Sequence, residues 1–378
     1  MEDIKKLYPL KFLPIAETFD WGGEQMHIRY SKSFVVADDK GNEKKLPQGV
    51  PVAESHELAD LGYRDSQVRE GWLAGNSISE LMDTYLDRLV GEDPFAHFGR
   101  QFPVGVKFID ATGRIPLMVC PDDNTARSRY DFLGKTKLWY VVDAKEGAQL
   151  FIGFKQDISS ADFYSACISG DMEKHLNVIT PHKGDSFIIT PGEVHSAAGG
   201  VLLLEVSQAS PLDLCLTGWG KELPEGEFDP ALNFIEALDF VNLRKHLAPA
   251  RPSSPAELAN LQQFKVSRIE LKDPAHIFGA QYGCFLFYSC VEGEFSVRIG
   301  GENEEREDYI VRSGESVLLP AGVEDFYLLP RTMGTTLLEI TLPLQADRDG
   351  YIDPEAEEKL KEESLKGESL KGEEEKEW

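Results

Sequence analysis

The chain has 378 residues, 42% of them hydrophobic and 28% charged, and this composition can bury a sizeable core, which excludes a disordered or fibrous protein. The net charge of −26 excludes nucleic acid as a partner, because an acidic chain repels phosphate backbones. No apolar run approaches the ~20 residues of a membrane span, the N-terminus has no apolar signal region, and the five cysteines include no CxxC pair. We therefore expect a cytoplasmic protein that contacts no membrane.

The first hundred residues are predicted to hold short strands and one clear helix. Turn residues such as Trp21-Gly-Gly interrupt residues 7–50, a pattern typical of short strands. The helix is predicted over Ser77–Val90, because Ser77 and Glu80 have the spacing of a capping box and apolar residues recur along one face. Gly91 is positioned to end this helix.

Two β-rich blocks follow, over residues 104–216 and 264–342, each built of short apolar runs between turn residues. Between them, Asp229-Pro230 predicts the start of a helix that runs to about His246. The proline-rich residues 248–255 predict a linker between two domains. Residues 353–378 have an excess of acidic side chains and a repeated Glu-Ser-Leu-Lys-Gly segment, which predicts a solvated acidic tail.

The two β-rich blocks share an internal repeat. A tight turn at a glycine, a strand and a second turn would aim a polar side chain into the mouth of a small barrel. The repeat has the same spacing at Gly184, Gly192 and His195 as at Gly314, Gly322 and Asp325. It resembles the second motif of the cupin fold, so two copies predict a mainly β protein with two tandem cupin barrels. Because Asp325 stands where the first copy has a histidine, we predict a structural role for the second barrel.

Longer segments between residues 8 and 220 carry a more specific resemblance. They occur in the order known from one family: Trp21-Gly-Gly, Glu54-Ser55, Phe102–Ala111, Cys120-Pro-Asp-Asp123, Gly134–Tyr140, Gly192-Glu-Val-His195 and Leu202–Glu205. Together they resemble the type I mannose-6-phosphate isomerases, a zinc-dependent family built on two cupin barrels plus a helical segment. The resemblance implies an N-terminal cupin with the helical segment over 1–247, a linker over 248–255, a C-terminal cupin over 256–345 and an acidic tail over 346–378.

The resemblance also implies a site in the N-terminal barrel. In the family, one zinc ion is held there by Gln, His, Glu and a second His, and this sequence has at those positions Met118, Cys120, Lys137 and His195. A family arginine is replaced by Cys215, whereas Lys107, Glu205 and Gln208 match their family counterparts. The sequence therefore keeps residues of the active site but departs from the zinc ligands.

These substitutions change the chemistry of the predicted site. Met is a weak ligand for zinc, and a Lys ammonium has no lone pair and repels a cation. Two like charges ~4 Å apart cost roughly 4 kcal/mol at an effective dielectric of 20. We therefore predict that no zinc is bound. Zinc with a Glu ligand has the same net charge as Lys137 with neutral neighbours, so we expect the Lys137 ammonium near the vacated metal position. Neutral surroundings would also lower its pKa.

Two residues of the predicted site have a second interpretation. Cys120 and His195 would form a rebuilt metal site if Glu193 or His182 joined them. Otherwise His195 is a hydrogen-bonded structural residue and Cys120 is a small buried side chain. The sequence leaves both interpretations open.

Three functions follow from this reading, and we favour the first. It is an isomerase-like protein of carbohydrate metabolism that binds a hexose or hexose phosphate and has lost zinc-dependent aldose–ketose isomerisation. The second is an active mannose-6-phosphate isomerase, forming fructose 6-phosphate, with an altered metal site. The third is a scaffold protein without a small ligand. For the first, we expect Lys107 and Glu205 at the family's catalytic positions, either touching substrate or joined as an ion pair, and substrate contacts from Lys107, Lys137, His195 and Gln208.

Overall fold

The computed structural model describes residues 5–37, 43–47, 49–217, 219, 233–247, 256–300 and 306–343. The predicted linker over 248–255 and the predicted acidic tail over 346–378 lie outside these residues, as do Asp229 and Pro230 at the predicted helix start. Within the described ranges, no helix has the length and apolar character needed to cross a membrane.

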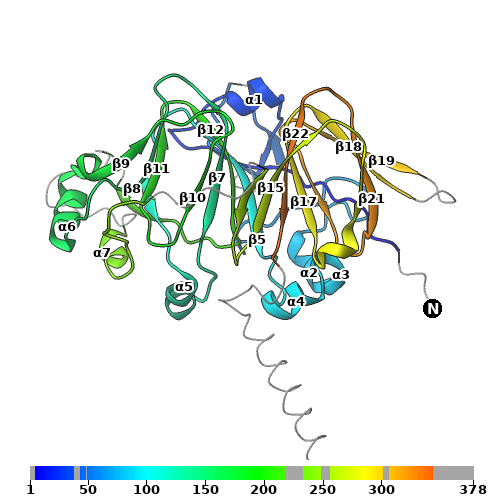
Figure 1. The fold of residues 1–378 in the computed structure, drawn as a ribbon, viewed down its shortest axis with the longest axis horizontal. Coiled ribbons are helices and arrows are strands. Elements are labelled where there is room, and N and C mark those ends of the chain that lie inside the picture. Colours follow the sequence, from blue (N-terminus) through cyan, green and yellow to red (C-terminus); the bar gives the residue numbers. More distant parts are fainter. Residues whose placement is uncertain are drawn as a thin grey trace, which may run out of the picture.

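The protein is mainly β and contains two barrels side by side, each made of two antiparallel sheets (Figure 1). One sheet of the first barrel contains β1 (Ile15–Glu17), β4 (Glu54–Leu58), β5 (Val104–Ala111), β7 (Lys137–Ala144), β10 (Ser186–Ile189) and β12 (Val201–Gln208). Its strand order is β1-β4-β5-β12-β7-β10. The other contains β6 (Leu117–Val119), β8 (Gln149–Phe154), β9 (Leu176–Ile179), β11 (His195–Ala198) and β13 (Leu214–Thr217). Its order is β13-β6-β11-β8-β9.

The second barrel repeats this plan with fewer strands. Its first sheet contains β14 (Glu257–Asn260), β15 (Lys265–Leu271), β17 (Leu286–Glu292), β20 (Ser316–Leu319) and β22 (Thr335–Thr341), in the order β14-β15-β22-β17-β20. Its second sheet contains β16 (Ala275–Phe278), β18 (Glu294–Ile299), β19 (Glu307–Arg312) and β21 (Asp325–Pro330), in the order β16-β21-β18-β19. The predicted pair of tandem cupin barrels is therefore confirmed.

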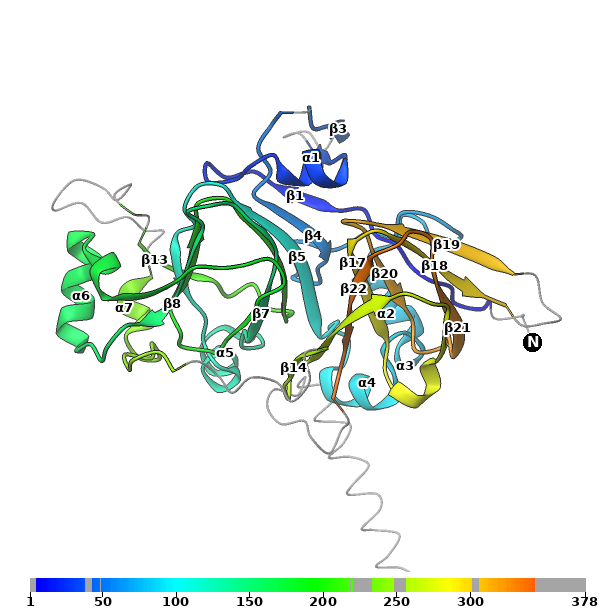
Figure 2. The same ribbon diagram turned by 45° about the horizontal axis from the view of Figure 1, so that its top comes forward.

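The remaining elements are short. A two-stranded sheet of β2 (Val35–Ala37) and β3 (Glu43–Lys45) lies beside α1 (Gln25–Tyr30), above β1 and β4 (Figure 2). The other helices are α2 (Ile78–Tyr85), α3 (Asp87–Val90), α4 (Glu92–Phe98), α5 (Asp123–Tyr130), α6 (Ser160–Ser169) and α7 (Phe234–Ala237), with 3₁₀ turns η1 (Met172–His175) and η2 (Gly279–Tyr282). Helices α6 and α7 cover the outer face of the five-stranded sheet of the first barrel.

The six-stranded sheet is covered on both faces, which explains its continuous apolar runs. On β12, Val201 and Leu203 pack in the core between the two sheets of the first barrel. Leu202 and Leu204 point the other way and join the core shared with the second barrel. Successive side chains of a strand alternate between its faces, so odd-numbered residues of β12 lie inside the barrel. The two barrels are thus joined by a packed apolar layer.

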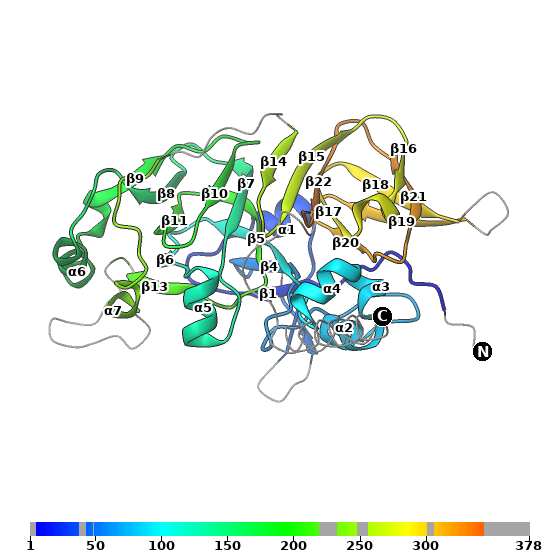
Figure 3. The same ribbon diagram turned by 60° about the horizontal axis from the view of Figure 1, so that its bottom comes forward.

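The predicted helix over Ser77–Val90 is interrupted. Ser77 and Glu80 form the expected capping box at the start of α2, but Leu86 has φ +50° and separates α2 from α3. The reason is tertiary: the carbonyls of Leu89 and Val90 accept hydrogen bonds from backbone N–H groups of the second barrel. Helices α2–α4 therefore lie against that barrel (Figure 3). The helix predicted to reach His246 is also wrong in the described part, where α7 ends at Ala237.

The internal repeat is confirmed as structure but not in the direction of its last side chain. His195 begins β11 and Asp325 begins β21, as the repeat predicts. His195 is buried inside the first barrel, whereas Asp325 is exposed and pairs with His276. The buried residues of β21 are Phe326 and Leu328, so strand alternation turns Asp325 outward. The expectation that both side chains enter a barrel mouth is wrong for Asp325.

Candidate functional site

Strand alternation brings charged side chains together inside the first barrel. Glu205 is an inward residue of β12, and the same alternation turns Lys107 on β5 and Lys137 on β7 inward. Lys107 and Glu205 are direct cross-strand partners, and Trp139 of β7 faces Glu205 from the other side. Three of the residues predicted from the sequence therefore lie on one face because of register.

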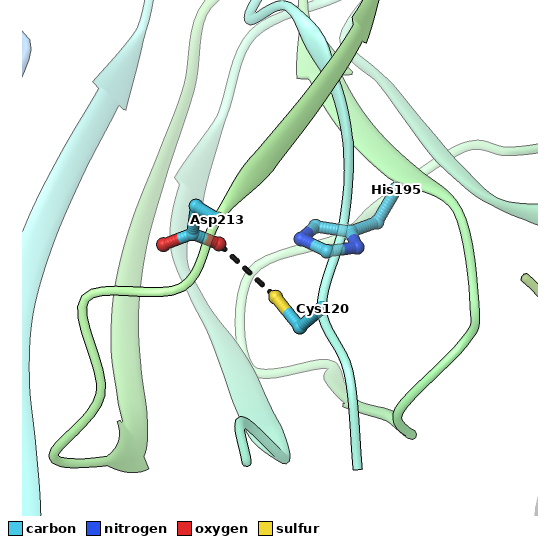
Figure 4. A group of neighbouring side chains, drawn as sticks. All are labelled: Cys120, His195 and Asp213. Carbon is cyan, nitrogen blue, oxygen red and sulfur yellow. Dashed lines mark hydrogen bonds between the residues drawn. The ribbon is translucent and has the colours of Figure 1, made fainter. Parts of the chain in front are cut away.

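The facing sheet supplies the other candidate residues. Met118 on β6 is the cross-strand partner of both His195 on β11 and Cys215 on β13. Cys120 comes directly after β6, and Asp213 comes directly before β13. The side chains of Cys120, His195 and Asp213 point toward one another (Figure 4), and Cys120 Sγ lies 3.2 Å from Asp213 Oδ1.

The ammonium of Lys137 lies among these three side chains. Its Nζ is 3.0 Å from His195 Nε2, contacts Asp213 Oδ1 and is 3.7 Å from Glu205 Oε2. Burial alone would lower the pKa of Lys137, but the carboxylate of Asp213 holds this pKa well above its usual value. The expectation of a lowered pKa is wrong, because the surroundings of Lys137 are acidic and not neutral.

His195 is held in one tautomer. Its Nδ1 lies 2.9 Å from the carbonyl oxygen of Glu193 and donates a proton to it, which leaves the lone pair of Nε2 facing Lys137. Burial, and next the charge of Lys137, lower the pKa of His195 to about 3. The imidazole is therefore neutral and accepts a hydrogen bond from the ammonium.

Asp213 is the residue that sequence reasoning missed. It pairs with Lys135 at 2.6 Å and with Lys137, so one carboxylate is shared by two ammonium groups. The charges of these lysines hold the pKa of Asp213 well below its usual value although burial raises it. A signal was present in the sequence: the predicted site lysine Lys137 needs a counter-charge, and Asp213 is the next acidic residue after Glu205.

A second ion pair lies beside the first. Lys107 Nζ is 2.9 Å from Glu54 Oε1 and 3.7 Å from Glu205 Oε1. Trp139 Nε1 donates to Glu205 Oε2 at 2.7 Å. Glu205 Oε1, by contrast, is buried and has no hydrogen-bond partner. Glu205 is thus held on one oxygen and unsatisfied on the other, between two lysines.

The rim of the site is charged as well. His56 Nε2 lies 3.3 Å from Glu54 Oε2 and 3.7 Å from Glu17 Oε1. The potential ligand atoms of these three residues lie within 4.8 Å of one another, but Arg64 pairs with Glu17 and Lys107 with Glu54. The cations already neutralise both carboxylates, so we assign no metal to this group.

The remaining predicted residues lie apart from this cluster. Gln208 donates through Nε2 to Asp123 Oδ1 at 2.8 Å, near the start of α5. The carboxylate of Glu193 turns to His246, and the His182 side chain is exposed. Neither Glu193 nor His182 therefore joins Cys120 and His195 as a metal ligand.

Cys120, His195 and Asp213 have the chemistry of zinc ligands, but Lys137 interacts with two of them. Their ligand atoms lie within 4.8 Å of one another, and zinc accepts thiolate, imidazole and carboxylate. The Lys137 ammonium, however, donates a hydrogen bond to the lone pair of His195 Nε2 and contacts Asp213, so neither group is free to bind a metal. Burial raises the pKa of the Cys120 thiol, which keeps its proton. The residues present do not fit a divalent cation.

The Glu54–Lys107 pair makes stability depend on pH. Burial raises the pKa of Glu54, but the charge of Lys107, together with the hydrogen bond and charge of His56, outweighs burial and lowers this pKa to about 2, below its usual 4.5. A lowered folded pKa contributes stability above the unfolded pKa and loses it as the pH falls toward 2. We expect Glu54→Gln to destabilise the protein by on the order of 3 kcal/mol at pH 7. In urea denaturation, this difference should shrink steadily below about pH 4.5; a difference that does not change with pH would contradict the assignment.

Comparison with known proteins gives a consistent result. No family model matches the chain. It is 28% identical over 327 residues to the "Probable mannose-6-phosphate isomerase GmuF" of Bacillus subtilis (strain 168), spanning 84% of this chain and 95% of that protein. It is 25% identical over 315 residues to the mannose-6-phosphate isomerase of Streptococcus mutans, spanning 81% of this chain and 90% of that protein.

Solved structures share the fold. The mannose 6-phosphate isomerase from Bacillus subtilis superposes with a TM-score of 0.73 at 22% identity, covering 89% of this chain and 100% of that one. A mutant of phosphomannose isomerase from Salmonella typhimurium superposes with a TM-score of 0.67 at 15% identity, covering 89% of this chain and 100% of that one. In sequence over most of its length, and in its two-barrel fold, the chain is therefore similar to mannose-6-phosphate isomerases.

Proposed function

We propose that this protein binds a hexose or hexose phosphate in its first barrel without zinc, and that it has lost zinc-dependent aldose–ketose isomerisation. The observation that carries the proposal is the Lys137 ammonium, which is 3.0 Å from His195 Nε2 and contacts Asp213. It takes up the space in which the three candidate ligands converge. A metal ion would have to displace this cation.

The charges of the site also argue against isomerisation. The reaction moves a proton between neighbouring carbons through an enediol, and needs a base and a positive charge beside the developing oxyanion. Burial raises the pKa of Glu205, but Lys137 and Lys107 lower it below its usual value, so this carboxylate is a weak base. The positive charge of Lys137 is already compensated by Glu205 and by Asp213, which Lys137 shares with Lys135. Both features support the proposal that isomerisation has been lost.

Two features of the same site support sugar binding. Lys107 and Glu54 are only slightly exposed at the edge of the cluster, and Glu205 Oε1 lacks a hydrogen-bond partner. A buried acceptor without a partner costs about 1–3 kcal/mol. A ligand hydroxyl that donates to this oxygen would remove that cost, which favours binding.

Ligand binding and metal content can be measured on the full-length protein. We expect a hexose or its 6-phosphate at 100-fold excess over its dissociation constant to stabilise the metal-free protein by ~2.7 kcal/mol in thermal denaturation. We also expect no conversion of mannose 6-phosphate to fructose 6-phosphate, with or without a chelator. Tyr63 has an exposed ring beside Arg64 of the rim, so Tyr63→Ala should weaken binding by about tenfold, or ~1.4 kcal/mol. Tyr164→Ala, on the distant α6, should leave binding unchanged.

The other two functions predict different results. One observation favours an active isomerase with an altered metal site, namely the convergence of Cys120, His195 and Asp213. That function requires one zinc ion per chain and turnover that stops on chelation. A scaffold protein would show neither turnover nor stabilisation by any hexose, and that result would refute the proposal.

A further inference from the structure

The cations around the first barrel's cluster already have carboxylate partners. In the described part of the chain, Lys107 pairs with Glu54 at 2.9 Å and Lys135 with Asp213 at 2.6 Å. Lys137 shares Asp213 and lies 3.7 Å from Glu205.

The rim adds one more pair, of Arg64 with Glu17. The four cations are thus matched by four carboxylates, so the charges of these lysines, Arg64 and the carboxylates sum to zero.

This balance disfavours a phosphate group. A phosphate monoester carries about −1.5 to −2 charges at pH 7 and would have to compete with carboxylates for the same N–H donors. It would also lie close to those carboxylates, and like charges ~4 Å apart repel by roughly 4 kcal/mol at an effective dielectric of 20. An uncharged ligand avoids both costs. The charge balance therefore favours binding of a free sugar over binding of its phosphate.

A ligand hydroxyl group could supply the hydrogen bond that the cluster lacks. Glu205 Oε1 is buried without a hydrogen-bond partner. Lys107 Nζ lies 3.7 Å from Glu205 Oε1, which is too far for a hydrogen bond between them. A hydroxyl group can accept a hydrogen bond from the ammonium and at the same time donate a hydrogen bond to the carboxylate. A phosphate dianion has only acceptors and cannot satisfy Glu205.

An exposed aromatic ring lies next to this cluster. Tyr63 is 65% exposed, and the guanidinium of Arg64 lies 4.3 Å from the centre of its ring. Burial raises the pKa of Tyr63, and the charges that act next on its hydroxyl are those of Asp213, Lys107 and Glu54. The ring therefore offers an apolar surface to the C–H groups of a ligand whose hydroxyls face the charges.

We infer that the ligand of the first barrel is an uncharged sugar or polyol, and that the barrel discriminates against sugar phosphates. The inference rests on the proposed function and narrows its ligand class. The hydroxyl groups would exchange hydrogen bonds with Glu205, Lys107 and Glu54. The discrimination against phosphate would come from the carboxylates that pair with each cation.

Calorimetric titration of the full-length protein at constant ionic strength tests this inference. The probes are D-mannose and D-fructose and their 6-phosphates. We expect at least one free hexose to bind about tenfold or more tightly than its phosphate. Glu17→Gln, which frees Arg64, should tighten binding of the phosphates and leave the free hexoses unchanged. Glu173→Gln, which removes the same charge beside Arg114 on the outer surface, should change neither.

The outcomes separate the two proposals. If the 6-phosphates bind more tightly than the free hexoses, the inference is overturned and the proposed function stands. If no hexose and no hexose phosphate binds, the proposed function fails and the inference fails with it. If a free hexose binds but Glu17→Gln does not improve phosphate binding, then charge balance is not the cause of the selectivity.

Discussion

Lys137→Glu is expected to turn the cluster into a metal site that binds one zinc or cobalt ion per chain. The substitution replaces a positive charge by a negative one, so the charge of the cluster falls by two, which a divalent cation would restore. It also frees His195 Nε2 and Asp213 Oδ1, which now contact the ammonium. With Cys120 these groups offer sulfur, nitrogen and oxygen ligands, the set that zinc prefers. A bound metal would deprotonate the buried thiol of Cys120.

Metal analysis after dialysis gives the stoichiometry, and the absorption of the cobalt form reports a thiolate ligand. Lys137→Gln is the matched control, because it removes the ammonium without adding a charged ligand, and it should bind metal weakly. The double substitution Lys137→Glu with Cys120→Ser should lose the thiolate absorption. A folded Lys137→Glu protein that takes up no more metal than the wild type would refute the idea that the ammonium alone prevents metal binding.

Asp213→Asn is expected to destabilise the protein by about 3–5 kcal/mol. The substitution removes the carboxylate that Lys135 and Lys137 share and leaves both ammonium groups buried without their closest counter-charge. A buried charge that loses its partner is far more costly than a lost surface pair. The loss should appear as a lower midpoint in urea denaturation at pH 7.

Two further variants test the cause of this loss. Asp239→Asn removes the same chemical group from an exposed pair with Arg129 and should have little effect. Combining Asp213→Asn with Lys137→Met removes a cation together with its anion, and should recover part of the lost stability. If Asp213→Asn is as mild as Asp239→Asn, the ion pairs inside the barrel do not support the fold.

The pairing of charges distinguishes this site from a metal site that has only lost its ion. Lys137 has not merely entered a place that metal ligands surround, because Asp213 compensates its charge and His195 accepts its hydrogen bond. Lys107 is compensated in the same way by Glu54. Because the cations of this site are matched in number by carboxylates, we propose that the site needs no metal and that it recognises a ligand through hydrogen bonds more than through net charge.

The sequence by itself determined the architecture and, through its resemblance to a known family, several residues of the site in the first barrel. The repeat at His195 and Asp325 predicted two barrels, because turn glycines and short apolar runs are local signals. The resemblance to a known family assigned Lys107, Lys137 and Glu205 to one site, and the alternation of β5, β7 and β12 in the structure explains why they share a face. The resemblance of the sequence to a known family also pointed to the substituted metal ligands.

Only the tertiary structure decided which charges meet. Asp213 lies outside any strand, and its approach to Lys135 and Lys137 depends on how the two sheets of the barrel face each other. The break at Leu86 likewise depends on N–H donors of the second barrel, which are distant in sequence. Local patterns specify which way a side chain points along its own strand, whereas its partner across the barrel, and therefore its charge state, is set by packing between elements far apart in the chain.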